Sequence, residues 1–252
     1  MARTEASYIL NARDVQRYLG DGETATHILK GVSLEVRQGE YVSIIGASGS
    51  GKSTFLYLLG GLDRPTKTRP DGSTVEPRSS VKIAGIETTD LPDAELAMLR
   101  NEKLGFVFQF HYLLKEFTAQ ENVALPMFKL GRLGRGAAMD RAGALLDRLG
   151  LGSKLRRRAN RLSGGEQQRV AIARALANEP AVLLSGEPPG NLVKKNNQRG
   201  PGIFAELAAG GQSIVMVTHE LTLAHRAARI ITMEDGQIIR DEETRERREM
   251  RE

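Results

Sequence analysis

The nine residues GASGSGKST, at positions 46–54, constrain the fold of this chain more than any other segment. They follow the strand-like run YVSII and precede the helix-forming run FLYLLG, so a glycine-rich turn would join a strand to a helix. The glycines let the backbone bend until several N–H groups face one anion, and the positive end of the helix adds to the attraction. Lys52 would bring a point charge to the phosphates, and the Ser53 hydroxyl would bind Mg²⁺. The pattern predicts a phosphate-binding loop with the nucleotide contacts Gly46, Ser48, Gly49, Ser50, Gly51, Lys52, Ser53 and Thr54.

The segments around this loop predict a mainly parallel α/β core that is interrupted by a helical insert. Short strand-like runs bounded by glycine fill the first 110 residues, with helix-length segments among them. Farther on, Leu145, Leu146 and Leu149 recur at spacings of three and four, which indicates an apolar helical stripe. After Arg161 the expected elements are helices at 169–177, 204–209 and 223–228 and strands at 181–185, 213–217 and 229–233.

Three segments fit this alternation poorly. Residues 66–80 are rich in Pro, Ser, Thr and Arg and predict an exposed loop. The Gly-Pro-Gly sequence at 200–202 disfavours a helix there, because proline in a helix interior costs about 3 kcal/mol, so the next helix should begin near Ile203. The charged residues 240–252 predict a solvated, fraying helix or a tail.

Composition excludes several classes of site and location. The chain has no cysteine, which excludes disulfides, thiolate zinc sites and cysteine nucleophiles. No apolar run reaches the roughly 20 residues of a membrane-spanning helix, and the first 20 residues lack an apolar segment of signal-peptide length, so we expect the chain to stay in the cytoplasm. The net charge of +5 would suit nucleic acid or an anionic membrane surface, but a modest excess usually serves solubility alone.

The segment LSGGEQQR, at 162–169, is a second candidate for anion binding. Ser163, Gly164 and Gly165 directly precede an expected helix, so free N–H groups would point at a phosphate. Alone, the motif would be read as a helix N-cap. Its occurrence together with the phosphate-binding loop favours the nucleotide-binding interpretation.

Five features, in chain order, resemble the ATP-binding subunit of an ABC transporter. They are the phosphate-binding loop, Gln109 in GFVFQ, the segment LSGGEQQR, the segment GEPPGNL, and His219 in MVTHE. The resemblance covers essentially the whole chain. The run FVFQFHYLLKEFTAQENVALPM is most similar to the ATPases of the lipoprotein-releasing (Lol) system, with the macrolide-exporter ATPases next.

This resemblance implies a fold and a division of the chain. We expect one P-loop NTPase domain over residues 1–252, with a mainly parallel sheet and an antiparallel β subdomain. The nucleotide-binding core would comprise residues 1–109 and 162–252, and the helical subdomain residues 110–161. ATP and Mg²⁺ are the implied cofactors.

The resemblance also implies roles for individual side chains. Tyr18 would stack on the adenine ring, although a tyrosine that merely ends a strand explains it about as well. Gln109 would contact Mg²⁺ and the attacking water, and Glu187 would be the general base that orients this water. His219, at the expected end of a strand, would contact the γ-phosphate.

The implied partners are a second copy of the chain and a membrane permease. In a head-to-tail dimer, Ser163 and Gly165 of one copy would close on the ATP held by Lys52 of the other. The helical insert would receive the permease, and the cassette would lie on the cytoplasmic face of the inner membrane. The basic run at 154–161 is either a solvated face or a contact with anionic headgroups. The residues expected near the permease are Phe110, His111, Tyr112 and Leu113.

The segment LLSGEPPGNLV departs from the family pattern at three positions. Gly186 and Val193 stand where the family has Asp, and Pro189 stands where it has Thr or a similar residue. The Asp at the first position normally holds Mg²⁺ through its water shell, and loss of such a partner typically costs about 10- to 100-fold in metal affinity or activity. Val193 would remove a polar contact across the dimer.

Three explanations of these departures are open. The chain is an active but slow ATPase, or it binds nucleotide and closes with little hydrolysis, or residues 185–202 are an altered part of the sequence. A different class of function is a soluble ABC protein that acts on nucleic acid or ribosomes. Such proteins generally carry two nucleotide domains or long inserted arms, and neither is present in this sequence.

Overall fold

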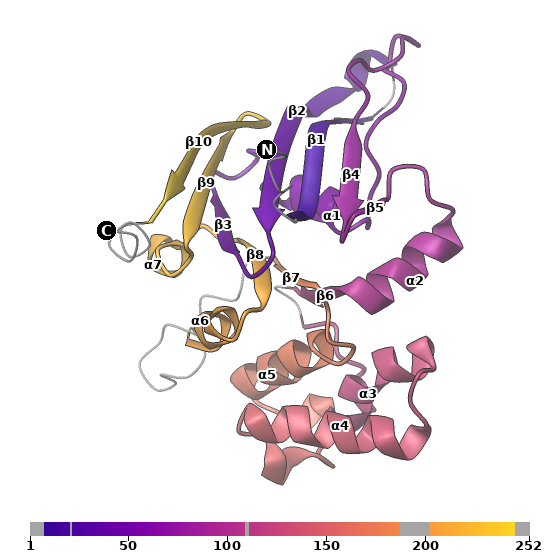
Figure 1. Cartoon of the computed structure of the whole chain (residues 1–252), viewed down its shortest axis with the longest axis vertical. Coiled ribbons are helices and arrows are strands. Elements are labelled where there is room, and N and C mark those ends of the chain that lie inside the picture. The colour runs from indigo at the N-terminus through magenta and orange to yellow at the C-terminus, as the bar shows by residue number, and fades with distance from the viewer. Residues whose placement is uncertain (1–7, 21, 109–110, 187–201, 245–252) are drawn as a thin grey trace, which may run out of the picture.

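The computed structural model describes residues 8–20, 22–108, 111–186 and 202–244. These residues form two sheets that enclose a helix, with a group of helices below them (Figure 1). The first sheet is antiparallel, with the strand order β2-β1-β4-β5. Its strands are β1 (Tyr8–Leu19), β2 (Thr26–Arg37), β4 (Ser80–Ile83) and β5 (Ile86–Glu87).

The second sheet has six strands in the order β10-β9-β3-β8-β7-β6, and all neighbours except β10 and β9 are parallel. The strand β3, which precedes the phosphate-binding loop, is therefore flanked by two parallel strands. The mainly parallel core with an antiparallel β subdomain is thus confirmed. The six strands are β3 (Tyr41–Ile45), β6 (Leu104–Val107), β7 (Val182–Ser185), β8 (Ser213–Val217), β9 (Arg229–Glu234) and β10 (Gln237–Glu243).

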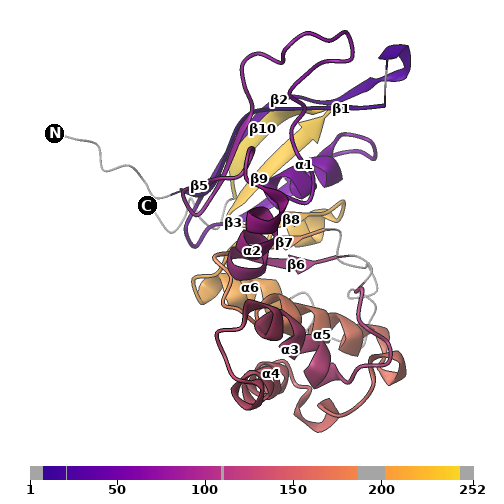
Figure 2. The same ribbon diagram turned by 90° about the vertical axis from the view of Figure 1, so that its right-hand side faces the viewer.

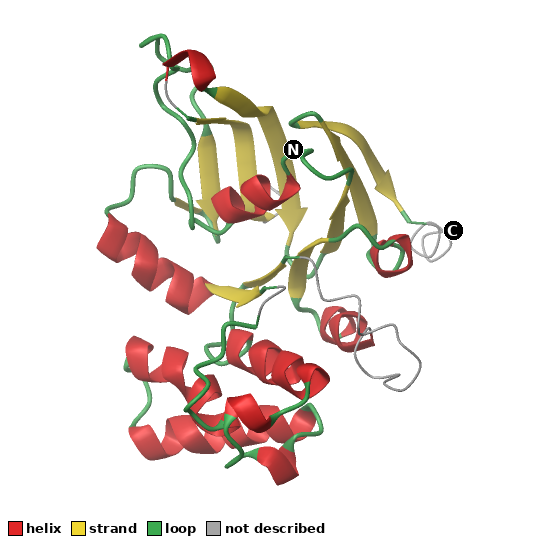
Figure 3. Cartoon of the chain, turned by 180° about the vertical axis from the view of Figure 1, so that it is seen from behind, coloured by secondary structure: helices red, strands yellow, loops and turns green. Residues whose placement is uncertain are grey.

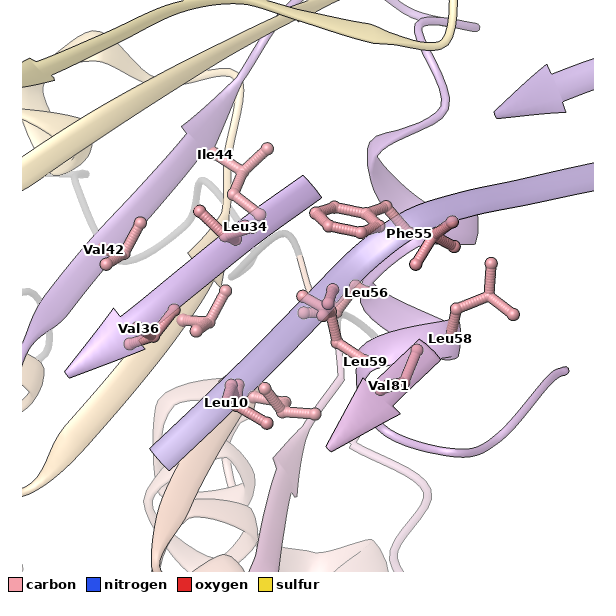
Figure 4. Close-up of a cluster of buried hydrophobic side chains, with 14 of the residues drawn as sticks. Leu10, Leu34, Val36, Val42, Ile44, Phe55, Leu56, Leu58, Leu59 and Val81 are labelled. Carbon is pink, nitrogen blue, oxygen red and sulfur yellow. The ribbon is translucent and has the colours of Figure 1, made fainter. Parts of the chain in front are cut away.

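The helix α1 (Lys52–Leu59) lies between the two sheets and fills the larger hydrophobic core (Figure 4). Phe55, Leu56, Leu58 and Leu59 are each at most 2% exposed, and they pack with residues from both sheets. Burial of this many apolar side chains contributes about 1.5 to 3 kcal/mol for each of them. The packing therefore fixes α1, and with it the phosphate-binding loop, against the sheets.

The helical region forms a second core. The helices α3 (Ala119–Leu130) and α4 (Arg135–Arg148) pack with one side of α5 (Gly164–Ala175), as Figure 2 shows. Ile172 and Ala175, also on α5, belong to a different cluster that covers the six-stranded sheet. The helix α5 thus packs against both the helical region and the six-stranded sheet. The helix α2 spans Asp93–Lys103 and directly precedes β6 in the chain.

Most expected elements are present, but the C-terminal expectation is wrong for residues 240–243. They belong to β10, which pairs with β9 at the edge of the six-stranded sheet (Figure 3). The side chain of Arg229 on β9 forms a salt bridge with Asp241. Backbone pairing and this ion pair override the low strand propensity of the charged run. The helix expected at 223–228 is also misplaced, because α7 spans only Leu221–Ala224.

Two further expectations about single segments agree with the structure. Residues 66–79 form a largely exposed loop, and α6 spans Gly202–Ala209, in line with a start near Ile203. Short 3₁₀ turns occur at Gly22–Thr24, Gly152–Lys154 and Ala159–Arg161. Among the residues described, no helix combines the length and apolarity needed to cross a bilayer.

Candidate nucleotide-binding site

The phosphate-binding loop requires glycine at two of its positions for steric reasons. Gly46 has φ 151°, and a Cβ atom there would lie 2.1 Å from the carbonyl oxygen of Met233. Gly51 has φ 94°, and its Cβ would lie 2.9 Å from Cδ2 of Leu29. Only glycine combines this backbone conformation with so close an approach to neighbouring atoms. The loop is thus held against β9 on one side and β2 on the other.

The loop opens directly into the N-terminus of α1. The N-cap is Gly51, which offers no side-chain hydrogen bond, and the first turn has no acidic residue. The Lys52 side chain is buried, and its Nζ donates to the carbonyl oxygens of Gly46 at 2.9 Å and Ala47 at 2.6 Å. A positive helix end and a lysine with no carboxylate in the first turn fit a phosphate group.

The other expected contacts lie on the same loop. Ser50 is buried, and its Oγ accepts a hydrogen bond of 3.2 Å from Nζ of Lys52. Ser48 and Gly49 are exposed on the loop. Ser53 is also exposed, at the second position of α1, and its part as a ligand of Mg²⁺ stays a prediction.

The ends of three parallel strands bring further predicted residues to this edge of the sheet. Ile44 on β3 pairs with Val217 on β8, so His219 follows two residues after the end of the strand beside the loop. On the other side of β8, the strand β7 ends at Ser185, immediately before Gly186. Ligands of open α/β sheets bind at the carboxyl ends of the strands, which is where these residues meet.

Gly186 has no structural requirement for glycine. Its N–H donates to the Val107 carbonyl oxygen at 3.0 Å, and its φ lies outside the left-handed range. A Cβ atom at this position would lie 3.6 Å from Cδ2 of Leu56, which is an ordinary van der Waals contact. The backbone therefore accommodates a residue with a Cβ atom beside α1 without a clash.

The ring of Tyr18 is partly covered by a neighbouring side chain. It stacks on His27 with ring centroids 4.0 Å apart, and the next residue, Ile28, has its carbonyl oxygen 3.1 Å from the Cβ position of Gly51. A base would therefore have to stack on the opposite face of the tyrosine. Burial lowers the pKa of His27 and favours the neutral ring.

The segment LSGGEQQR forms the start of α5, in the helical region away from the phosphate-binding loop (Figure 1). Ser163 is the N-cap of a capping box. Its Oγ accepts from the Glu166 N–H at 3.3 Å, and its own N–H donates to Oε2 of Glu166 at 2.7 Å. This hydrogen bond from the Ser163 backbone is the main reason that the pKa of Glu166 is lowered. Ser163 and Gly164 are exposed, and Gly165 is half-buried.

The structure adds an arginine that the sequence analysis did not single out. Arg174 on α5 donates to the carbonyl oxygens of His111 and Tyr112, each at 2.8 Å. Burial lowers the pKa of His111, opposed by a hydrogen bond to the Gly164 carbonyl, and the charge of Arg174 lowers it further. His111 and Tyr112, from the segment expected near the permease, are thereby attached to the last turn of α5. The signal in the sequence was a single cation within the otherwise apolar run VAIARALA.

Several predicted residues lie outside the part of the chain that the structure describes. They are Gln109, Phe110, Glu187, Pro189 and Val193. Within the described ranges, no group of three or more His, Cys, Asp or Glu side chains is placed to hold a metal ion.

Comparison with known proteins decides the family. A family model described as ABC transporter matches residues 29–190. The chain belongs to the ABC transporter family. It is an ATP-binding cassette with the ATPase fold expected from the phosphate-binding loop and the LSGGEQQR segment.

Similar proteins and a similar solved structure indicate which members of the family this chain resembles. The lipoprotein-releasing system ATP-binding protein LolD of Aquifex aeolicus is 52% identical, over 92% of this cassette and 96% of that protein. The macrolide export ATP-binding/permease protein MacB of Aggregatibacter actinomycetemcomitans is 42% identical, over 94% of this cassette but only 35% of that protein. A dimeric ATP-binding cassette solved in a post-hydrolysis state with ADP and Pi is 38% identical, with a TM-score of 0.82, covering 94% of this cassette and 99% of that chain.

Proposed function

We propose that this cassette binds and hydrolyses ATP with Mg²⁺ to drive a membrane permease in lipoprotein release or a related export process. The observation that carries the proposal is the loop from Gly46 to Gly51, which presents Lys52 and an uncapped helix end at the carboxyl edge of a parallel sheet. The 52% identity to a LolD protein supports the lipoprotein-releasing assignment. Attachment to a permease would hold the cassette on the cytoplasmic face of the inner membrane.

Each predicted residue has a part in the hydrolysis step. Lys52 would neutralise charge on the β- and γ-phosphates, and Ser53 would hold Mg²⁺ together with Gln109. The metal would neutralise charge that develops on the phosphate oxygens. Glu187 would accept a proton from the attacking water while it orients that water, and His219 would donate a hydrogen bond to the γ-phosphate.

The site would be completed by a second copy of the cassette. Ser163 and Gly164 are exposed at the start of α5, in the helical region rather than beside their own phosphate-binding loop (Figure 1). In a head-to-tail dimer, the backbone N–H groups of Gly164 and Gly165 would face the γ-phosphate bound to the partner's loop. The dimeric state of the 38% identical cassette supports this arrangement.

A cavity beside β6 is the proposed contact with the permease. It has a volume of about 300 Å³ and is mostly apolar. Phe106 stacks on Phe108 with centroids 5.5 Å apart, and Phe108 meets Tyr112 edge to face at 5.6 Å. A short amphipathic segment of the permease would place apolar side chains in this cavity. Its walls include Leu62, Ala97, Phe106, Phe108, Pro126 and Arg174.

The test of the proposal is Mg²⁺-dependent ATP hydrolysis by the unmodified cassette and by the variants Glu187→Gln and Gly186→Asp. We expect turnover by the unmodified chain, its loss in Glu187→Gln, and a rise of about 10- to 100-fold in Mg²⁺ affinity or rate in Gly186→Asp. Turnover by Gly186→Asp alone would mean that the natural chain is a nucleotide-binding partner with little hydrolysis. If no variant hydrolyses ATP, Gly186 is not the main cause of the missing activity. Val193 or the Gly-Pro-Gly sequence would then be the cause to test next.

A further inference from the structure

An exposed surface next to the start of α3 combines apolar and cationic side chains. The apolar members are Tyr112, Leu114 and Phe117, which are 64%, 45% and 39% exposed. The cationic members are Lys115, from the segment before α3, and four arginines from the segment before α5, and all of them are exposed. We call this surface the basic-apolar patch, which consists of Tyr112, Leu114, Lys115, Phe117, Arg156, Arg157, Arg158 and Arg161.

The two segments of the basic-apolar patch are joined by backbone hydrogen bonds. The N–H of Ala159 donates to the Phe117 carbonyl oxygen at 2.9 Å, and the N–H of Ala119 donates to the Arg157 carbonyl oxygen at 2.9 Å. Thr118 and Arg158 form an isolated β-bridge. The arginines therefore stand beside the exposed apolar side chains in one continuous surface, although about 40 residues of sequence separate the two segments.

The charge of this surface is only partly offset within the described part of the chain, since Glu121 attracts Arg158 and Glu166 attracts Arg157. None of the four arginines forms a salt bridge there. The nearby carboxylate of Glu121 accepts hydrogen bonds from the backbone and side chain of Thr118, and that of Glu166 accepts one from Ser163. Glu116 is the remaining acidic residue in the segment and is exposed.

We propose that the basic-apolar patch binds directly to the anionic headgroups of the membrane, as a contact separate from that with the permease. Arginine pairs well with phosphate, because its planar guanidinium donates two parallel hydrogen bonds. The aromatic and leucine side chains beside the arginines suit the boundary between headgroups and acyl chains. The orientation rests on the proposed function, since Tyr112 meets Phe108, which lines the cavity assigned to the permease, and would lie on the membrane side.

The competing occupant is an acidic segment of the permease, which would meet the same charges. The apolar members favour the lipid surface, because three large apolar side chains are exposed on segments that lie beside the arginines. Tight binding to anionic lipid needs several cations together with an apolar contact, and the basic-apolar patch supplies both.

The experiment measures co-sedimentation of the whole cassette with vesicles of phosphatidylcholine, with or without phosphatidylglycerol. The test variant is Arg156→Gln/Arg157→Gln/Arg158→Gln, and a second variant is Leu114→Ser/Phe117→Ser. The charge-matched control is Arg13→Gln/Arg148→Gln/Arg240→Gln, which removes three exposed arginines elsewhere. Thermal unfolding of each variant checks its fold, and ATP binding is measured separately, so that failure of the proposed function can be told from failure of the patch.

We expect binding only to vesicles with phosphatidylglycerol, and a decrease with increasing salt. The triple variant of the patch should bind about 100-fold more weakly, and the charge-matched control should lose much less. Equal losses in the two triple variants would overturn the proposal, since net charge alone would then explain binding. The proposal would also fail if the patch variants bound vesicles normally but no longer assembled with the permease.

Discussion

The two helix N-termini in the predicted site are built differently. At α1 the N-cap is a glycine in the left-handed conformation, no side chain caps the helix, and the first turn has no acid. At α5 a capping box is complete, with Ser163 and Glu166 each satisfying a backbone N–H of the other. The first end leaves its positive potential for an outside anion, whereas the second already contains its own carboxylate.

The difference indicates which of the two helix N-termini can bind a phosphate within a single subunit. The N-terminus of α1 also holds the charge of Lys52, so it can bind a nucleotide within one subunit. The N-terminus of α5 carries a negative charge three residues from Ser163, which weakens its attraction for a phosphate. We infer that α5 contributes chiefly once a nucleotide on the partner subunit brings further contacts.

The largest expected effect comes from removing the charge at α1. Lys52→Ala should lower the rate of ATP hydrolysis by about 100- to 1,000-fold, because this cation would stabilise the charge that develops on the phosphates. Nucleotide binding and hydrolysis by the purified cassette measure it. The matched control is Lys82→Ala, which removes an exposed lysine on β4. Unchanged hydrolysis in Lys52→Ala would contradict the assignment of the loop.

The next largest effect is expected when glycines in the phosphate-binding loop are replaced by alanine. Gly46→Ala should destabilise the fold by about 3 kcal/mol, because its Cβ would meet the Met233 carbonyl oxygen at 2.1 Å. Gly49→Ala should cost only about 1 to 2 kcal/mol, since φ is 81° but nothing lies within 4 Å of its Cβ. Urea unfolding of both variants measures the difference. Equal losses would show that backbone strain, rather than the close contact with β9, decides the cost.

A smaller effect is expected at α5. Ser163→Ala should lower the free energy of unfolding by about 1 kcal/mol through loss of the cap. It should leave nucleotide binding by a single subunit unchanged and weaken ATP-dependent dimerisation. Ser153→Ala, at an exposed position, is the control and should change stability by less than about 0.5 kcal/mol. Lost binding of nucleotide by single Ser163→Ala subunits would remove the distinction between the two helix ends.

The smallest effect is a pH dependence at the contact between His111 and Gly164. The pKa of His111 is lower in the folded chain than in the unfolded chain, so the unfolded state binds the proton more tightly. Stability from this group is therefore complete above about pH 6.5 and decreases as the pH falls below that value. Since the pKa of His27 is also lowered, the profile is measured in a His27→Gln background with and without His111→Gln. An unchanged slope in the double variant would refute the effect.

The sequence was sufficient where a local pattern determines the structure. The strand before Gly46, the helix after Gly51 and the cap at Ser163 all depend on residues within a few positions. The pairing of β1 was not predicted, because its partners on β2 and β4 lie elsewhere in the chain. Charged residues 240–243 were misassigned for the same reason.

The residues of the candidate site also fall into those that depend on local patterns and those that depend on contacts distant in the sequence. The glycines of the phosphate-binding loop follow from the local pattern, since Gly46, Gly49 and Gly51 all have positive φ, whereas the nucleotide contacts of the loop stay a prediction. The contact of Arg174 with His111 joins residues 63 positions apart, and no periodic pattern in the sequence predicts a contact over this separation. The covering of Tyr18 by His27 depends on the register of β1 and β2, which local patterns do not specify.

The charged strand β10 has a consequence for how copies of this protein meet in solution. It ends the six-stranded sheet, and it carries Arg240, Asp241, Glu242 and Glu243 in succession. Strands at sheet edges readily extend into neighbouring molecules, and dense charge on the edge is a common defence against such growth. A concentrated solution of the cassette is thereby protected from joining sheet to sheet, so association is directed to surfaces other than this edge.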